Sequence, residues 1–125
     1  MHFHIYKCVR HVFEECLRVI EFRAAGAGDL MDASHYSSRK FLENSCPEVD
    51  ELVRITKEAG AYVSRITGAG WGGCTVSLVA GDKVDSLFEK LVATYPAYKG
   101  LEGEALKQVI FATKPSSGAC VLKLE

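Results

Sequence analysis

A run of six residues rich in glycine has the composition of a loop that could approach a phosphate group closely. The run is Gly68-Ala69-Gly70-Trp71-Gly72-Gly73. Glycine reaches positive φ without steric cost, and the exposed backbone N–H groups of such a loop suit an anion. The letters satisfy G-x-G-x-x-G, but in a dinucleotide-binding site that pattern opens a helix. Here residues 74–79 alternate with the period of a strand, so we exclude a dinucleotide site. A P-loop is excluded because no Lys-Ser or Lys-Thr pair closes the glycines.

The glycine run lies between two β-type segments, residues 61–67 and 74–79. Protein kinases cover the phosphates of ATP with a similar strand, glycine loop and strand, but the strand lysine, H-R-D and D-F-G of that family are absent. Two interpretations stay open. The loop faces a phosphate, or it is a tight hairpin whose small residues permit a close backbone approach. Trp71 favours a site, because so much apolar area at a hairpin tip requires a cover.

Three further side chains could contribute to chemistry. His35 could be a base or a ligand, because its pKa lies near neutrality. With serines beside it and no carboxylate four residues away, a buried, hydrogen-bonded histidine at a close helix contact is the favoured interpretation. Arg39 is predicted to lie on the surface, and Arg65 stays open as a phosphate partner because it lies just before the glycines. No nucleophile, base and acid are brought together by the sequence, so we assign no catalytic residue.

Length and composition exclude several function classes. A chain of 125 residues predicts one domain, residues 1–125. With 15 basic and 16 acidic residues and no basic stripe, nucleic acid is not an expected partner. The five cysteines are odd in number and lack a C-x-x-C pair, which predicts reduced, mostly buried thiols, no disulfide framework and no metal site. No signal peptide or membrane-spanning run is recognisable, so we expect the cytoplasm and no membrane partner.

Three helices are expected before the glycine run. Apolar residues repeat at helical spacing over residues 9–20, with charged residues on the other side, which predicts an amphipathic helix. A second helix over about residues 30–42, with Asp29 as its N-cap, carries small polar groups on one face. Ser45 and Glu48 form a predicted capping box for a third helix, which ends at Gly60 in a left-handed conformation.

After the second strand the pattern becomes helical again. Apolar residues over 84–95 predict a helix that Pro96 stops. Residues 97–107 are expected to form a surface loop, and residues 109–113 and 119–124 two further strands. The order of three helices, two strands, a helix and two strands predicts an α+β fold, with helices packed on one face of a largely antiparallel sheet.

Several segments resemble the galactokinases, which are members of the GHMP kinases (galactose, homoserine, mevalonate and phosphomevalonate kinases). The segment Arg65-Ile66-Thr67-Gly68-Ala69-Gly70-Trp71-Gly72-Gly73-Cys74-Thr75-Val76 resembles the third conserved motif of that family. The other matching segments follow in the family order and extend over nearly the whole chain. They are Arg10-His11-Val12 with Glu15 and Arg18-Val19, Leu30-Met31-Asp32-Ala33-Ser34-His35, Ser45-Cys46-Pro47-Glu48-Val49-Asp50, and Phe111-Ala112-Thr113-Lys114-Pro115.

The resemblance implies a ferredoxin-like domain, the GHMP kinase C-terminal domain, whose glycine loop faces the cleft near the nucleotide phosphates and the sugar. Candidate supporting residues are Arg65, Thr67, Ser34 and His35. In the family, the ATP-phosphate loop and the aspartate that activates the sugar lie in the amino-terminal domain. No segment of this sequence matches that loop, so we expect the chain alone to have no sugar-kinase activity and not to bind ATP or Mg²⁺ tightly.

The intact parent would transfer the γ-phosphate of MgATP to O1 of galactose or N-acetylgalactosamine. Trp71 and the segment that begins at Phe111 are most similar to the N-acetylgalactosamine kinase branch. The expected partner of this chain is the missing amino-terminal kinase domain or a dimer partner.

The sequence departs from the family in one place. Between Phe22 and Leu30 the family usually has a longer helical stretch. A rival interpretation is a non-catalytic protein-interaction or self-association module derived from the kinase domain, because exposed apolar surface seldom stays bare. A small ligand sensor is a third interpretation, which rests on analogy between folds alone.

Overall fold

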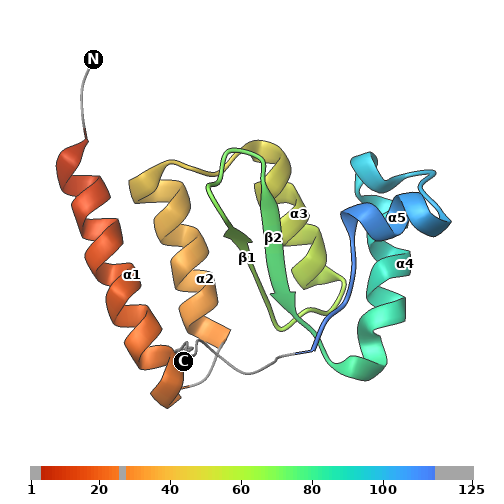
Figure 1. The fold of residues 1–125 in the computed structure, drawn as a ribbon, viewed down its shortest axis with the longest axis horizontal. Coiled ribbons are helices and arrows are strands. Elements are labelled where there is room, and N and C mark those ends of the chain that lie inside the picture. The colour runs from red at the N-terminus through yellow and green to blue at the C-terminus, as the bar shows by residue number, and fades with distance from the viewer. Residues whose placement is uncertain (1–3, 26–27, 115–125) are drawn as a thin grey trace, which may run out of the picture.

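The structure is a computed structural model that describes residues 4–25 and 28–114. Figure 1 shows helices α1, α2 and α3, a two-stranded hairpin, and helices α4 and α5. The helices are α1 (Ile5–Ala25), α2 (Gly28–Ser37), the π-helix η1 (Ser38–Leu42), α3 (Pro47–Glu58), the 3₁₀ turn η2 (Gly81–Lys83), α4 (Val84–Thr94), the 3₁₀ turn η3 (Pro96–Tyr98) and α5 (Gly103–Val109). The strands are β1 (Val63–Thr67) and β2 (Cys74–Leu78).

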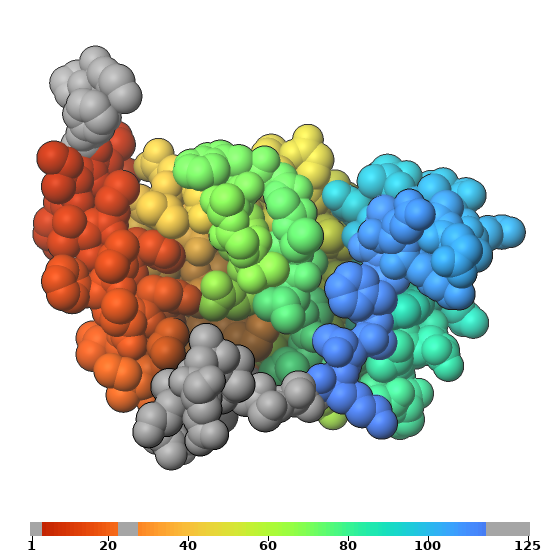
Figure 2. Space-filling model, viewed as in Figure 1, coloured from red at the N-terminus to blue at the C-terminus, as the bar shows by residue number. Residues whose placement is uncertain are grey.

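The two strands form an antiparallel hairpin, with Val63 opposite Leu78 and Thr67 opposite Cys74. The hairpin lies across α3, and α2 lies beside β1 (Figure 1). Its opposite face is open on the surface between α1 and the α5 region (Figure 2). The predicted α+β class, with an antiparallel sheet packed on helices, is confirmed.

The predicted helical stripes of α3 and α4 form most of the core. On α3, Val49, Val53 and Thr56 are buried as predicted, and Leu87 and Leu91 of α4 are buried likewise. One cluster joins α3 to α4 and a second joins α3 to β1; their buried members are Ile55, Ala59, Ala61, Leu87 and Leu91 in the first and Val49, Val53 and Ile66 in the second. α3 therefore connects the hairpin to the rest of the molecule.

The end of α3 is as predicted, but its start is not. The Gly60 N–H donates to Lys57 O and the Ala61 N–H donates to Thr56 O, with Gly60 at φ 115°, which is the Schellman pattern of a helix C-terminus. At the start, Cys46 and not Ser45 is the N-cap. The predicted capping box is wrong, because the Ser45 hydroxyl donates to Asp50 at 2.6 Å instead.

The second helix is close to its predicted range but changes geometry. Its small polar face is buried as expected, with Ser34, Ser37 and Ser38 almost inaccessible. The last five residues form the π-helix η1, which ends at Glu43 in the left-handed region with φ 55°. Such π-helical turns are frequent at functional sites.

The orientation of α1 differs from that of the other helices. The apolar residues of its predicted stripe are exposed, including Phe13 and Ile20, whose exposed fractions are 69% and 71%. The face that packs inward is polar and carries His11, Glu15 and Arg18. The helix is amphipathic as predicted, but hydrogen bonds and ion pairs hold it to its neighbours (described below).

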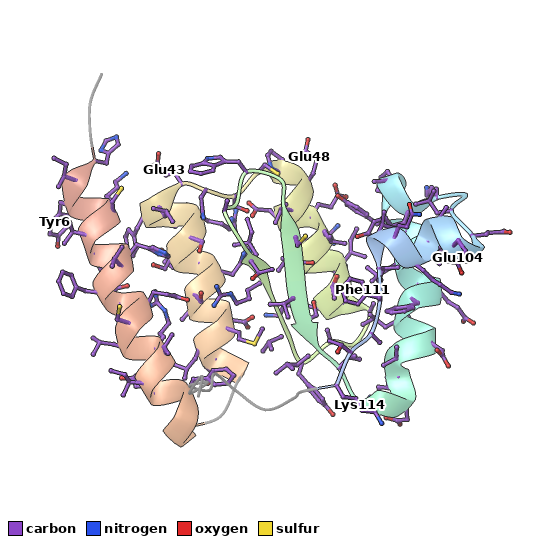
Figure 3. All side chains as sticks on the ribbon, in the orientation of Figure 1. Tyr6, Glu43, Glu48, Glu104, Phe111 and Lys114 are labelled. Carbon is purple, nitrogen blue, oxygen red and sulfur yellow. The ribbon has the colours of Figure 1, made fainter. Side chains whose placement is uncertain are left out.

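The chain after Pro96 differs from prediction. The expected loop over residues 97–107 contains α5, and the expected strand over 109–113 is absent. Leu101 and Leu106 line a groove with Phe88 and Val92 of α4, which favours a helical turn here over an extended chain. Phe111 lies exposed beyond that turn, on the segment that follows α5 (Figure 3). The predicted strand over 119–124 lies outside the described residues.

The cysteines are more exposed than expected. Cys8, Cys16 and Cys74 are exposed free thiols and Cys46 is half-buried, so the prediction of mostly buried thiols is wrong for these four. Cys120 lies outside the described residues. Among the helices in the part of the chain that the structure describes, none is long and apolar enough to cross a membrane.

Candidate functional site

The glycine loop (residues 68–73) joins β1 to β2 at one end of the hairpin. Its backbone is left-handed at Gly68, Gly70, Trp71 and Gly72, with φ of 75°, 88°, 51° and 108°. A non-glycine residue at such a φ is uncommon, so Trp71 must be held there by its contacts. A strand follows the loop, as the sequence predicted.

Trp71 fastens the loop to the connector between η1 and α3. Its backbone N–H donates to Asn44 O at 2.6 Å, and its indole Nε1–H donates to Glu43 O at 3.1 Å. Gly70 lies directly on Asn44, which is buried. Figure 3 shows Glu43 and Glu48 at the end of the molecule where the loop lies. The connector holds Trp71 through these hydrogen bonds but does not cover it, since 69% of the residue stays exposed.

The other side of the loop is open. Gly68, Ala69, Gly72 and Gly73 are exposed. Within the described residues, the amides of Gly68, Ala69 and Gly72 donate no hydrogen bond to backbone or side chain. Unpaired N–H groups in a glycine-rich turn of this kind, with Gly68 and Gly72 at positive φ, have the chemistry that holds phosphate oxygens. The loop therefore combines an anchored side with a side that fits an anion.

Arg65 and Ser34 meet on Glu15 of α1, away from the loop. The Glu15 carboxylate accepts from Ser34 Oγ at 2.7 Å, from Arg65 Nη1 at 2.9 Å and from Arg18 Nε at 2.9 Å. Burial raises the pKa of Glu15, but these donors outweigh it and hold the pKa below its usual range. The same residues line a pocket of about 150 Å³ between α1, α2 and β1. In this structure the Arg65 guanidinium is thus directed to α1.

His35 connects α2 to β1 and α3. Its Nδ1 accepts the backbone N–H of Ile66 at 3.3 Å, and its Nε2 lies 3.5 Å from an Asp50 oxygen. Asp50 is also held by Arg39 Nε at 2.6 Å, so Arg39 pairs with an acid as a surface arginine does. The buried, hydrogen-bonded interpretation of His35 is confirmed. Thr67 pairs with Cys74 at the base of the glycine loop and is half-buried.

The histidine contacts predict a pH dependence of stability. Burial lowers the pKa of His35, with Arg39 and Arg65 adding to this effect and Asp50 and Asp32 opposing it. The folded state therefore prefers the neutral ring, so stability is complete above the unfolded pKa of about 6.5 and falls as the pH drops below it.

The test is His35→Asn, which keeps an acceptor for the Ile66 N–H but cannot titrate. Thermal unfolding midpoints between about pH 8 and pH 5 should fall less steeply for the variant than for the natural chain. His11, whose pKa burial also lowers, remains in both proteins and sets the common background. Parallel curves would contradict the assignment.

Sequence reasoning missed three residues that hold the site. Glu15 and Asp50 had no predicted role in the site, although each collects donors from two or more elements. Asn44 had no signal in the sequence, since its importance comes from the loop that packs on it. Among the residues that the structure describes, no cluster of three His, Cys, Asp or Glu side chains could hold a metal ion.

The chain matches the family described as GHMP kinases C terminal over residues 13–97, which is more than half of its length. This match includes α2, α3, the hairpin with its glycine loop, and α4. The chain belongs to the GHMP kinase C-terminal domain family. The resemblance found in the motifs is therefore confirmed.

Its curated relatives are galactokinases. It is 38% identical to a galactokinase of Dictyostelium discoideum, over 97% of this chain and 30% of that protein. It is 35% identical to a galactokinase of Saccharomyces cerevisiae, over 96% of this chain and 26% of that protein. The chain thus spans less than a third of the relatives it matches, and the GHMP match places it in their carboxy-terminal part. More than two thirds of each of these relatives lies outside the matched segment.

A solved structure supports the fold. The mevalonate kinase of L. major, in complex with R-mevalonate, superposes with a TM-score of 0.52 and 30% identity, over 58% of this chain and 22% of that one. The alignment with the Dictyostelium relative extends over 152 positions, more than this chain contains, so the relative carries residues that this chain lacks.

Proposed function

We propose that this chain is the carboxy-terminal domain of a galactokinase-like sugar kinase, whose intact form transfers the γ-phosphate of MgATP to O1 of galactose or N-acetylgalactosamine. The observation that carries the proposal is the 38% identity to a galactokinase over 97% of the chain. MgATP supplies the phosphoryl group, and the chain contributes positioned donors. The unpaired amides of Gly68, Ala69 and Gly72 would hold phosphate oxygens.

The supporting residues act indirectly in this proposal. Trp71 fixes the loop on the connector, Arg65 and His35 fix β1 against α1 and α2, and Ser34 joins α2 to α1 through Glu15. Phosphoryl transfer depends on positioning and on charge stabilisation, so the loop must keep its place to within a fraction of an ångström. The catalytic aspartate and the ATP-phosphate loop belong to the amino-terminal domain, and the cytoplasm is the expected compartment.

A hybrid enzyme tests the proposal. In this hybrid galactokinase, residues 1–125 replace the matching segment of the Dictyostelium relative. We expect ADP release that depends on added sugar. A correctly folded hybrid without sugar-dependent turnover would contradict the proposal.

Comparing galactose with N-acetylgalactosamine in the hybrid tests the finer prediction. If Trp71 and the Phe111 segment belong to the N-acetylgalactosamine branch, grafting them should raise kcat/KM for that sugar relative to galactose. An unchanged ratio would remove the basis for that preference.

Nucleotide binding to the chain alone can be followed without an assay of turnover. Trp71 is the sole tryptophan of the sequence and lies in the loop, so its fluorescence reports on any ligand there. We expect no saturable change with MgATP at micromolar concentrations. Saturation in that range would contradict the expected weak binding.

A further inference from the structure

The outward side of α1 is an apolar surface that no described part of the molecule covers. We define the α1 apolar face by its exposed residues, which are Ile5, Val9, Val12, Phe13, Cys16, Leu17 and Ile20. At about 1.5 Å per residue this face is about 22 Å long. Tyr6, at one end of it, points away from the rest of the molecule in Figure 3. Soluble proteins rarely leave so continuous an apolar surface exposed unless something binds it.

The helix cannot bury this face by rotating. His11 Nδ1 lies 2.9 Å from Ser37 Oγ, and Glu15 binds Ser34 and Arg65. Lys7 also pairs with Glu43, the residue whose carbonyl accepts the indole N–H of Trp71. Rotation would break all these contacts and leave partly buried charges unpaired. The cover must therefore come from outside the described residues.

We propose that the α1 apolar face packs against the amino-terminal domain of a galactokinase-like chain. This inference rests on the proposed function. Two observations favour this occupant over a second copy of the chain. The relatives extend far beyond the matched part, which is less than a third of their length. The match to the C-terminal family begins at residue 13, so the first part of α1 precedes the matched residues and lies towards the amino-terminal side of the chain.

Cysteine labelling tests the proposal without an activity readout. Cys16 lies within the α1 apolar face and its thiol is exposed; its labelling rate in the urea-unfolded protein is the internal comparison. A maleimide should label Cys16 in the isolated folded chain. In the folded hybrid galactokinase, Cys16 should react at least about tenfold more slowly, since thiol labelling requires access. Equal labelling of Cys16 in both proteins would overturn the proposal.

If Cys16 is protected in the hybrid but the hybrid shows no sugar-dependent turnover, the docking surface is supported and the proposed function fails. The isolated chain distinguishes a second copy. If Cys16 becomes protected there as the concentration rises, with a matching increase in mass by light scattering, the occupant is another copy and the proposal fails.

Substitutions give a second, independent measurement. In the isolated chain, Phe13→Asp should leave the unfolding midpoint within about 2 °C, because the side chain already contacts water. In the hybrid the same change should lower the midpoint by several degrees. The matched control is Tyr62→Asp, equally exposed but distant from α1 in the chain, which should have the same small effect in both proteins. A large loss in the isolated chain, or none in the hybrid, would overturn the proposal.

Discussion

Replacing Gly70 with alanine should destabilise the chain by roughly 3 kcal/mol or more, the largest effect expected for any single methyl group. A Cβ at this position would lie 2.3 Å from Asn44 O and 2.7 Å from Asn44 Nδ2. That carbonyl accepts the Trp71 N–H, so it cannot retreat without losing the hydrogen bond. The φ of 88° adds strain of its own.

Alanine substitutions at two other glycines distinguish the cost of the clash from the cost of backbone strain. Gly72→Ala has a φ of 108° but no atom within 4 Å of the added Cβ, so only strain of roughly 1–2 kcal/mol is expected. Gly81→Ala has neither problem and should change stability by less than about 0.5 kcal/mol. Urea denaturation of the three variants should rank Gly70 far above Gly72, and Gly72 above Gly81. If Gly70→Ala and Gly72→Ala cost the same, the loop does not rest on Asn44 as described.

Replacing Glu15 with alanine should cost roughly 2–3 kcal/mol. The change leaves Arg18, Arg65 and Ser34 without their common acceptor in a partly buried cluster. The neighbouring Glu14, which pairs with the exposed Arg10 and lies 3.5 Å from Arg18, is the matched control. Glu14→Ala should have a small effect, because exposed pairs contribute little.

Glu15→Ala should also differ from the natural chain in how its stability depends on acidic pH. The pKa of Glu15 is lowered in the folded state, so its stabilisation is complete above the unfolded pKa of about 4.3 and is lost as the pH falls through the folded value. The natural chain should therefore lose more stability than Glu15→Ala between about pH 5 and pH 3. Equal acid sensitivity would show that the cluster does not hold the carboxylate in its charged form.

The parts of the fold that depend on local pattern could be predicted. The period-two alternation around the glycines predicted the hairpin. The apolar stripe of α3, which ends at Gly60, predicted which residues form the core. The predicted capping box at Ser45 is wrong because the Asp50 carboxylate, five residues further on, accepts a hydrogen bond from the Ser45 hydroxyl. Capping rules based on sequence spacing do not take that competition into account.

The parts that depend on distant contacts could not be predicted. An apolar stripe normally indicates the buried face of a helix, yet on α1 the polar face is inside, since Glu15, Arg65 and Ser34 come together from three elements. The segment 109–113 has strand composition, but Leu106 and Ile110 pack towards α4, so a short helix forms before it. Asn44 supports the glycine loop through its backbone carbonyl, which any residue carries, so its type gave no signal.

We propose that this chain provides one half of a sugar-kinase site and requires an amino-terminal domain for chemistry. The most direct measurement is a coupled ADP-release assay of the purified chain with MgATP and either galactose or N-acetylgalactosamine. We predict no sugar-dependent ADP release from the chain alone and clear release from the hybrid galactokinase under the same conditions. Sugar-dependent turnover by the isolated chain would contradict the account.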